Sequence, residues 1–464
     1  MMTKIRAWIA ISCFVIPFFG GAALAQAAQG PIVVASAEPE VVWGYSYPGT
    51  ACAANDYPDV PVRPFMGNGP TPGTYRIHWF AGNSNGYFAS EAPGNPVSAN
   101  QVSLARIQRL PDCARWVESW PYANSTPENY YTGLWMVAPY TSDGVNVYAL
   151  IHNEFHGEWT GQSEWCSTQT RSIYLPCDYW NIVAATSDDS GGHFSLIQQQ
   201  SDQNTPAIAL PAPYTPNYAP GPQGMTAQSN IFGQGGYAYI LVEQFGTQLL
   251  KPADNGGVCL VRSQLPLGRA SRWQAWANGQ WVALPMVYPS NIPTTPPCSP
   301  ILPNTLSNRF RFSWSYNVIL SHFILIGLET DNSHVVTSSC PAANSSVGNS
   351  KEAFVYIIVK ADLAKGQFKV VTPETCLLRI NWFNQSGPND PANTGEAYPS
   401  LLDPSSPILQ PGGRIDLNFQ YSGSAPYLYA VRLDPYSQTN THYYDRDVVR
   451  WKLSISPLGP AKTR

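Results

Sequence analysis

The sequence is poor in charged residues and in histidine. Only 12% of the residues are Asp, Glu, Lys or Arg, below the usual ~25%, and the chain has 7 histidines. Acidic residues outnumber basic ones by 30 to 26. Because a protein that binds nucleic acid presents a basic face to the phosphates, this balance argues against a nucleic-acid partner.

Several enzyme signatures are also missing. The sequence has no Gly-rich phosphate loop and no G-x-S-x-G elbow, and no two cysteines have the C-x-x-C spacing of a zinc knuckle or redox pair. Long helical periodicity is nearly absent, since the best helix candidate, residues 98–120, is interrupted by Pro111. The sequence therefore predicts an all-β chain.

Long apolar runs are confined to the N-terminus. Lys4 and Arg6 begin a stretch that becomes apolar and ends in small residues, which predicts a signal peptide over residues 1–25. An uncleaved membrane anchor is the alternative. Cleavage removes two basic residues and no acidic one, so the net charge falls from −4 to −6. We expect a secreted or periplasmic protein without membrane contact after cleavage.

Nine cysteines occur, and Cys13 belongs to the signal peptide. The even number that remains predicts disulfides in an oxidising compartment. Many pairings are compatible with eight cysteines, and we expect neighbours along the chain to pair. The predicted pairs are Cys52–Cys113, Cys166–Cys177, Cys259–Cys298 and Cys340–Cys376.

Strand-length runs fill the rest of the sequence. Examples are "YRIHWF", "NVYALIHNEF", "YAYILVEQF" and "AFVYIIVKAD", which are rich in β-branched and aromatic residues and are bounded by Gly, Pro, Asn or Asp. The 43 prolines and 36 glycines supply the turns. We expect a flexible segment over residues 26–40 and a single β domain over residues 41–460.

One turn motif favours a particular architecture. After the strand "NIVAATS", residues Ser187, Asp189, Gly191 and Phe194 follow an S-x-D-x-G-x-x-F pattern, with His193 inside it. This spacing resembles the Asp-box of sialidases and related propellers. In that motif Asp and Gly form a tight turn and the aromatic residue packs beneath it.

Other segments resemble the blades of carbohydrate-active, glycoside hydrolase-like propellers. Residues 397–434 are similar to a closing blade and residues 271–284 to a Trp-rich outer hairpin. Division of the mature chain by a typical blade length gives five blades, and "VVWGYSY" would complete the last one. The resemblance implies an all-β, five-bladed β-propeller. A six-bladed propeller and a pair of β-sandwiches are the alternatives.

The stretch "ALIHNEFHG" carries a candidate acid. His152, Glu154 and His156 alternate along a predicted strand, so their side chains face the same way. Histidines spaced by ~7 Å or more on an extended strand do not easily share one ion, so no metal site is predicted there, although a bulge at Gly157 would reopen that alternative. A carboxylate between two imidazoles can have a shifted pKa, which suits a general acid.

Glycoside hydrolysis needs two carboxylates. The segment "NDYPDVPVRPF" resembles the opening blade of such hydrolases, which implies Asp59 as base or nucleophile, with Glu243 as a third carboxylate. Other side chains are expected to bind the sugar or orient the carboxylates: His152, His156, Arg63, His78, Trp180, Asn181 and Tyr398. No cofactor is expected, although a calcium ion in the channel stays an open alternative.

The preferred hypothesis is a secreted, monomeric glycoside hydrolase that cleaves a poly- or oligosaccharide. A glycan-binding propeller without catalysis and a structural scaffold are the alternatives. Two carboxylates at one channel mouth would favour the enzyme, whereas aromatic residues without such a pair would favour the binding module.

Overall fold

The computed structural model describes residues 31–44, 58–80, 88–90, 97–104, 108–109, 125–167, 177–245, 257–288, 298–302, 310–329, 335–381, 395–433 and 446–458, with isolated gaps inside several of these ranges. This part of the chain is nearly all β, as predicted. Its helical segments are short: α2 (Ser406–Leu409), η1 (Gly157–Trp159) and η3 (Leu363–Lys365). Within these ranges no helix is long and apolar enough to cross a membrane.

The strands form antiparallel groups that follow the order of the chain. The first group contains β3 (Arg63–Asn68), β4 (Tyr75–Phe80), β5 (Phe88–Ser90) and β6 (Gln108–Arg109). The second contains β7 (Leu134–Thr141), β8 (Val147–His156) and β9 (Asp178–Ser187), with β10 (Ser195–Leu196) and β13 (Pro206–Ile208) paired to β9. β11 (Gln198–Gln200) and β12 (Gln203–Asn204) form a small separate sheet, and in sequence they lie between β10 and β13.

The third group contains β14 (Gln223–Ala227), β15 (Phe232–Gln234), β16 (Tyr237–Phe245), β17 (Gly257–Gln264), β18 (Trp273–Ala277) and β19 (Gln280–Ala283). The fourth contains β20 (Ser313–Asn317), β21 (His322–Glu329), β22 (Glu352–Asp362) and β23 (Gln367–Ile380), with β25 (Tyr421–Ser422) parallel to β20. The last contains β24 (Gly395–Leu402), β26 (Tyr427–Leu433) and β27 (Arg446–Ile455).

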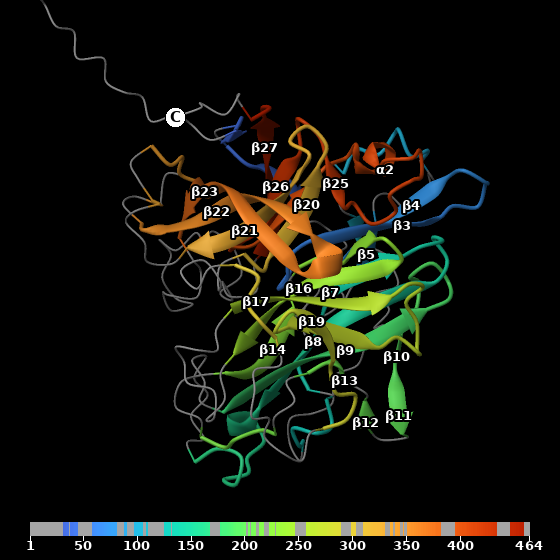
Figure 1. Ribbon diagram of the computed structural model, residues 1–464, viewed down its shortest axis with the longest axis vertical. Helices are drawn as coiled ribbons and strands as arrows, with labels where there is room; N and C mark the ends of the chain where they lie inside the picture. Colours follow the sequence, from blue (N-terminus) through green and yellow to red (C-terminus); the bar gives the residue numbers. More distant parts are fainter. Residues whose placement is uncertain are drawn as a thin grey trace, which may run out of the picture.

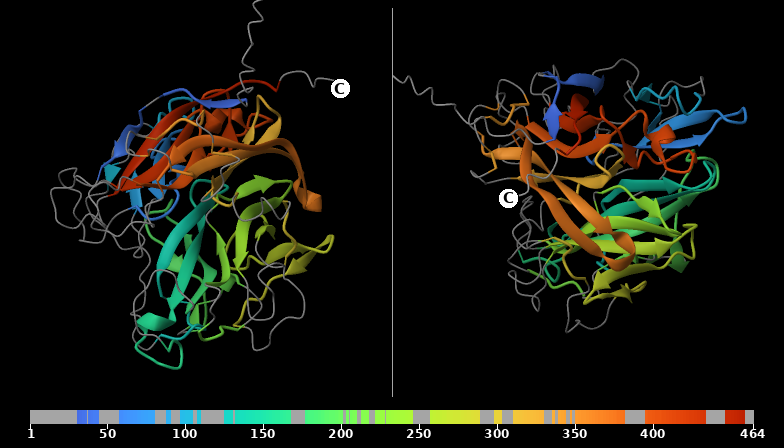
Figure 2. Two further views of the ribbon diagram at one scale, coloured as in Figure 1. Left: turned by 90° about the vertical axis from the view of Figure 1, so that its left-hand side faces the viewer. Right: turned by 45° about the horizontal axis from the view of Figure 1, so that its top comes forward.

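The N-terminal strands complete this last group. β1 (Ile32–Val34) and β2 (Glu40–Trp43) both pair antiparallel with β27, and Figures 1 and 2 show the blue N-terminal strands beside the red C-terminal ones. This pairing of the two chain ends matches the expectation for "VVW" and covers a sheet edge. β1 lies inside the segment that was expected to be flexible, and the buried side chain of Ile32 explains its order.

Successive antiparallel groups whose first and last strands join are the arrangement of a β-propeller. The second and third groups are further linked by a parallel pairing of β9 with β14, and the green strands of both lie together in Figures 1 and 2. The fold is therefore an all-β, propeller-type fold. The number of blades stays a prediction.

Disulfides occur as predicted at three places. Cys166–Cys177, Cys259–Cys298 and Cys340–Cys376 have Cα–Cα distances of 5.7, 6.0 and 5.8 Å, within the range of ordinary bridges. Cys52 and Cys113 lie outside the described residues. Each bridge therefore connects neighbours along the chain, and each lies within or beside one antiparallel group.

Gly224 is the point where β14 meets β9. It has a φ of +107°, and a Cβ atom at this position would lie 1.9 Å from the carbonyl oxygen of Trp180. Only glycine allows both the backbone conformation and this close approach. The junction between the second and third groups therefore depends on this residue.

Gly224→Ala is expected to lower the free energy of unfolding by ~2–5 kcal/mol, because overpacking adds to the cost of the positive φ. Gly235→Ala is the matched control, since Gly235 has a φ of +60° and nothing within 4 Å of an added Cβ. It should cost only ~1–2 kcal/mol in urea unfolding. Equal losses in the two variants would show that the contact with Trp180 is unimportant.

Candidate active site

The pairing of β8 with β9 arranges a polar face. His152 lies opposite Ile182, Glu154 opposite Trp180, and His156 opposite Asp178. Side chains of directly paired residues point to the same face of a sheet. This register therefore places the two histidines, Glu154, Trp180 and Asp178 on one face, as the alternation along β8 predicts.

Glu154 is held between the two imidazoles. Its Oε1 lies 2.8 Å from His152 Nε2 and its Oε2 lies 2.9 Å from His156 Nε2. Burial alone would raise the pKa of Glu154, but the hydrogen bonds to both imidazoles outweigh burial and lower the pKa to about 2. The carboxylate is therefore ionised, which is the opposite of the raised pKa that a general acid needs.

The Nδ1 atoms of the two imidazoles contact two other parts of the fold. His152 Nδ1 lies 3.0 Å from the hydroxyl of Thr226 on β14. His156 Nδ1 lies 2.8 Å from Asp178 Oδ1 and 3.3 Å from Glu158 Oε1. Burial lowers the pKa of His156, but Asp178 and the other carboxylates outweigh burial and raise it well above 6.5. Burial raises the pKa of Asp178 to about 7.

Glu158 and Asp178 were not among the predicted site residues. Glu158 follows His156 by two positions and continues the alternation of imidazoles and carboxylates, which is a signal that the sequence carried. Asp178 follows Cys177 at the start of β9, and nothing in its own neighbourhood marked it. With His156, these two side chains offer nitrogen and oxygen donors of the kind that bind a metal ion.

The side chain of Asp59 contacts two residues from the C-terminal part of the chain, Tyr398 and Arg446. Its Oδ1 accepts a hydrogen bond from the hydroxyl of Tyr398 at 3.2 Å and forms an ion pair with Arg446 Nη1. Burial raises the pKa of Asp59, Arg446 opposes that rise, and the negative charge of Glu154 adds to it. Asp59 and Glu154 therefore lie within electrostatic reach of each other.

Arg63, which was expected to hold Asp59 or the substrate, contacts other parts of the fold. Its guanidinium donates to Ser400 Oγ of β24 at 2.6 Å and to the carbonyl of Phe312 just before β20, so it joins three strand groups instead. Burial lowers the pKa of Arg63 to about 9. Arg446, which lies 387 positions from Asp59, takes the expected place.

Tyr398 reaches Asp59 from an irregular part of β24. The register of β24 against β26 shifts between Ala397 and Ser400, and Tyr398 has a φ of +55°. Such bulges re-aim side chains, and positive φ values at residues other than glycine are often found at functional sites. The bulge here directs the hydroxyl of Tyr398 to Asp59.

Glu243 lies on β16, the strand that pairs with β14, where Thr226 contacts His152. It occupies β16 directly opposite Thr226, and its Oε2 forms an ion pair with Arg311 Nη1. Burial raises the pKa of Glu243, and Arg311 opposes that rise. Thr226 thus connects the surroundings of Glu154 with those of Glu243.

Aromatic side chains adjoin the same face. The ring centroid of Trp180 lies 5.4 Å from that of His152 and 4.9 Å from that of Phe245, in both cases edge-on. The ring centroid of Trp135 lies 6.0 Å from that of His152. Trp135, Trp180 and Phe245 are all partly exposed, so they offer apolar surface beside Glu154.

Two predicted sugar-binding residues lie elsewhere. Asn181 follows Trp180 on β9, so its side chain points to the opposite face, where it is fully buried across from Asn153. His78 on β4 stacks on Phe65 at 4.8 Å, and burial lowers its pKa to about 4. Neither side chain shares the face of Glu154.

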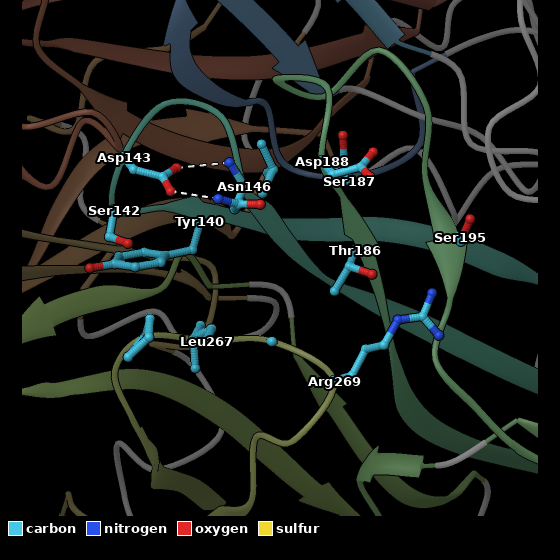
Figure 3. A pocket seen from close by; sticks show the side chains of 13 residues that line it. Tyr140, Ser142, Asp143, Asn146, Thr186, Ser187, Asp188, Ser195, Leu267 and Arg269 are labelled. Carbon is cyan, nitrogen blue, oxygen red and sulfur yellow. Dashed lines mark hydrogen bonds between the residues drawn. The ribbon is translucent and has the colours of Figure 1, made fainter.

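A cavity of about 460 Å³ lies at the other end of β8. Figure 3 shows its walls, which come from the turn between β7 and β8, the end of β9 and the loop after β17. The side chains that define it include Tyr140, Asp143, Asn146, Thr186, Asp188 and Arg269. The turn that resembles an Asp-box therefore forms one wall of this cavity, and neither Asp59 nor Glu154 lines it.

The turn itself has the contacts expected for that motif. Ser187 Oγ donates to Asp189 Oδ1 at 2.7 Å, and Ser187 Oγ accepts from the backbone N–H of Gly191 at 3.0 Å. Phe194 is buried and lies edge-on to Phe80 at 5.6 Å. The assignment as an Asp-box stays a prediction.

Comparisons with known proteins give likenesses of structure alone. No family model matches the sequence, and no curated protein matches it. A GH32 β-fructofuranosidase from Bombyx mori superimposes with 11% identity and a TM-score of 0.39 over 87% of this chain. The match covers 65% of that enzyme, so this chain spans less than two thirds of its length.

Two bacterial proteins of similar length also superimpose. A family 117 glycoside hydrolase from Zobellia galactanivorans has 9% identity and a TM-score of 0.41, over 90% of each chain. An α-L-arabinanase mutant from Cellvibrio cellulosa has 11% identity and a TM-score of 0.35, over 84% of this chain and 92% of the other. At such identities and scores, no activity is assigned to this chain from them.

Arg446→Met is expected to lower the free energy of unfolding at pH 7.5 by ~3–5 kcal/mol, because it leaves the Asp59 carboxylate buried without its cation. The pKa of Asp59 in the folded protein lies above 3.8 and rises further without Arg446. The stability cost of ionised Asp59 is therefore absent below the unfolded-state pKa of ~3.9, grows as the pH rises toward the higher folded-state pKa, and is complete above it. The loss should thus shrink at pH 4.5 in urea unfolding.

The double variant Asp59→Asn with Arg446→Met supplies the control. Removal of both charges should restore part of the lost stability at pH 7.5. The remaining loss should no longer differ between pH 7.5 and pH 4.5, because the carboxyl group of Asp59 is gone. A double variant that is less stable than Arg446→Met alone at pH 7.5 would contradict the assignment of this ion pair.

Proposed function

We propose that this protein is a secreted or periplasmic glycoside hydrolase with a five-bladed propeller fold. The observation that carries the proposal is the pair formed by Asp59 and Glu154. These carboxylates come from the first and second strand groups, interact electrostatically and are both partly exposed, at 16% and 19% of their side-chain surface. Hydrolysis of a glycosidic bond needs two carboxyl groups around one bond.

The contacts favour an exchange of the roles expected from the sequence. Glu154 accepts hydrogen bonds from two imidazoles, so its ionised form suits a base, a nucleophile or a group that stabilises developing positive charge. Asp59 is the better candidate for the acid, because burial and the charge of Glu154 favour its protonated form. Glu243 and Arg311 lie beyond Thr226 and would adjust the field around the pair.

The substrate class follows from the surface beside the carboxylates. Trp135, Trp180 and Phe245 present partly exposed rings, and flat apolar rings stack on the faces of pyranose sugars. A neutral or weakly charged poly- or oligosaccharide is therefore the substrate we propose. Three disulfides fit a protein that works outside the cytoplasm, after removal of the predicted signal peptide.

The same rings favour a second candidate, a glycan-binding module without catalysis. The two functions separate in one experiment that measures reducing-sugar release and glycan binding on the same panel of polysaccharides. Binding without release from any glycan would favour the module. Neither binding nor release across a broad panel would leave the scaffold hypothesis.

Glu154→Gln and Asp59→Asn are each expected to reduce reducing-sugar release by a factor of 100 or more, on the order of the contribution of a general acid or base. Asp362→Asn is the matched control, because Asp362 is an exposed carboxylate paired with Lys365 on the fourth strand group. Circular dichroism should show that all three variants fold. Full activity in Glu154→Gln or in Asp59→Asn would refute the carboxylate pair.

Tyr398→Phe is expected to move the alkaline limb of the pH–rate profile upward. The hydrogen bond from the Tyr398 hydroxyl lowers the pKa of Asp59, so its loss raises that pKa and keeps the acid protonated to higher pH. The measurement is kcat/KM across pH 4 to 9 for both proteins. A downward shift of this limb would assign the acid role to another residue.

A further inference from the structure

The geometry points to a buried site for a divalent metal ion, formed by His156 Nδ1 and the carboxylates of Glu158 and Asp178. One ligand atom from each of these residues lies within 4.8 Å of the other two. The nitrogen is 2.8 Å from Asp178 Oδ1 and 3.3 Å from Glu158 Oε1. Separations of this size bring three donors around one ion.

The carboxylates of this cluster need more positive charge than the described residues supply. Glu158 Oε2 is buried and has no hydrogen-bond partner among the described residues, and the side chains of Glu158 and Asp178 are each 2% exposed. In the same part of the chain, the ion pairs of Glu158 and Asp178 are both with the imidazole of His156, which also contacts Glu154. Buried carboxylates in such excess are costly without a cation.

The other ring nitrogen of His156 makes the contact that metal-bound histidines usually make. Its Nε2 lies 2.9 Å from Glu154 Oε2, and a histidine that binds a metal typically donates its second N–H to a carboxylate. A neutral His156 that donates from Nε2 to Glu154 presents the lone pair of Nδ1 to Glu158 and Asp178. A metal ion there would connect the two carboxylates to the imidazole that holds Glu154.

The surroundings make the site closed and rigid. Trp159 stacks on His156 with ring centroids 3.8 Å apart, and the hydroxyl of Tyr214 donates to the carbonyl of Cys177, next to Asp178. The disulfide Cys166–Cys177 fixes the start of β9. A closed site suits a structural ion, which stabilises the end of β8 and keeps His156 oriented.

The donor set favours zinc. One imidazole nitrogen and two carboxylate oxygens suit Zn²⁺, which binds both kinds of atom at ~2.0–2.2 Å. Calcium prefers six to eight oxygen ligands and rarely uses imidazole. This site differs from a metal site shared by His152 and His156, which the strand spacing argues against. It uses Nδ1 of His156 alone, and His152 takes no part.

Isothermal titration of the full, tag-free and chelator-treated protein with ZnCl₂ tests the proposal. We expect one saturable equivalent, and we expect Glu158→Gln and Asp178→Asn each to weaken it at least tenfold. Asp189→Asn is the matched control, because it removes an exposed carboxylate that pairs with His193, and it should bind zinc like the unaltered protein. No saturable binding to the unaltered protein would overturn the proposal and assign the counter-charge to protonated His156.

Unchanged zinc affinity in both variants would also overturn it, since the ion would then sit elsewhere. Co²⁺ absorption of the unaltered protein gives a test that does not depend on how the variants fold. Visible bands of protein-bound Co²⁺ that disappear on addition of one equivalent of Zn²⁺ are expected. Their absence would contradict the site. Neither measurement uses glycan hydrolysis. The result for the metal site is therefore separate from the result for the proposed glycoside hydrolase activity.

Discussion

The paired hydrogen bonds between Glu154 and two imidazoles are the interaction on which the polar centre of this protein depends. They hold Glu154 ionised, and its charge adds to the rise that burial causes in the pKa of Asp59, which precedes the first strand group. Through His152 the same carboxylate is joined to Thr226 on the third group. Through His156 it is joined to the acidic cluster at the start of β9. One side chain thus connects three separate parts of the fold.

Buried acids in this fold obtain their cations from distant parts of the chain. Asp59 pairs with Arg446, and Glu243 on β16 pairs with Arg311, which precedes β20. Buried ion pairs add little net stability, because desolvation offsets much of the attraction. Their geometry is nevertheless demanding, since either partner alone is costly. Such pairs therefore favour the arrangement of strand groups in which Asp59 and Glu243 each meet their arginine.

Local patterns in the sequence predicted the local features of the site. Alternation along β8 placed His152, Glu154 and His156 on one face, since a strand has a period of two. The same rule explains why Asn181 faces away from Glu154, because a shift of one residue reverses the face. Arg63 was chosen for its closeness to Asp59 in sequence, whereas Arg446 becomes adjacent only when the last strand group packs beside the first. That contact depends on the tertiary fold, which no local pattern specifies.

The two ends of β8 differ in how their polar groups are satisfied. Asp143, at the cavity end, accepts hydrogen bonds from the backbone of Val145 and Asn146 and from the Asn146 side chain, so its carboxylate serves the turn (Figure 3). Glu154 lies ~20–25 Å further along the strand, and its carboxylate accepts hydrogen bonds from the imidazoles of His152 and His156. A carboxylate committed to backbone N–H groups cannot take part in proton transfer without loss of the turn. Cavity volume alone would therefore select the end of β8 opposite to the proposed carboxylates, and the kind of hydrogen-bond partner is what favours Glu154.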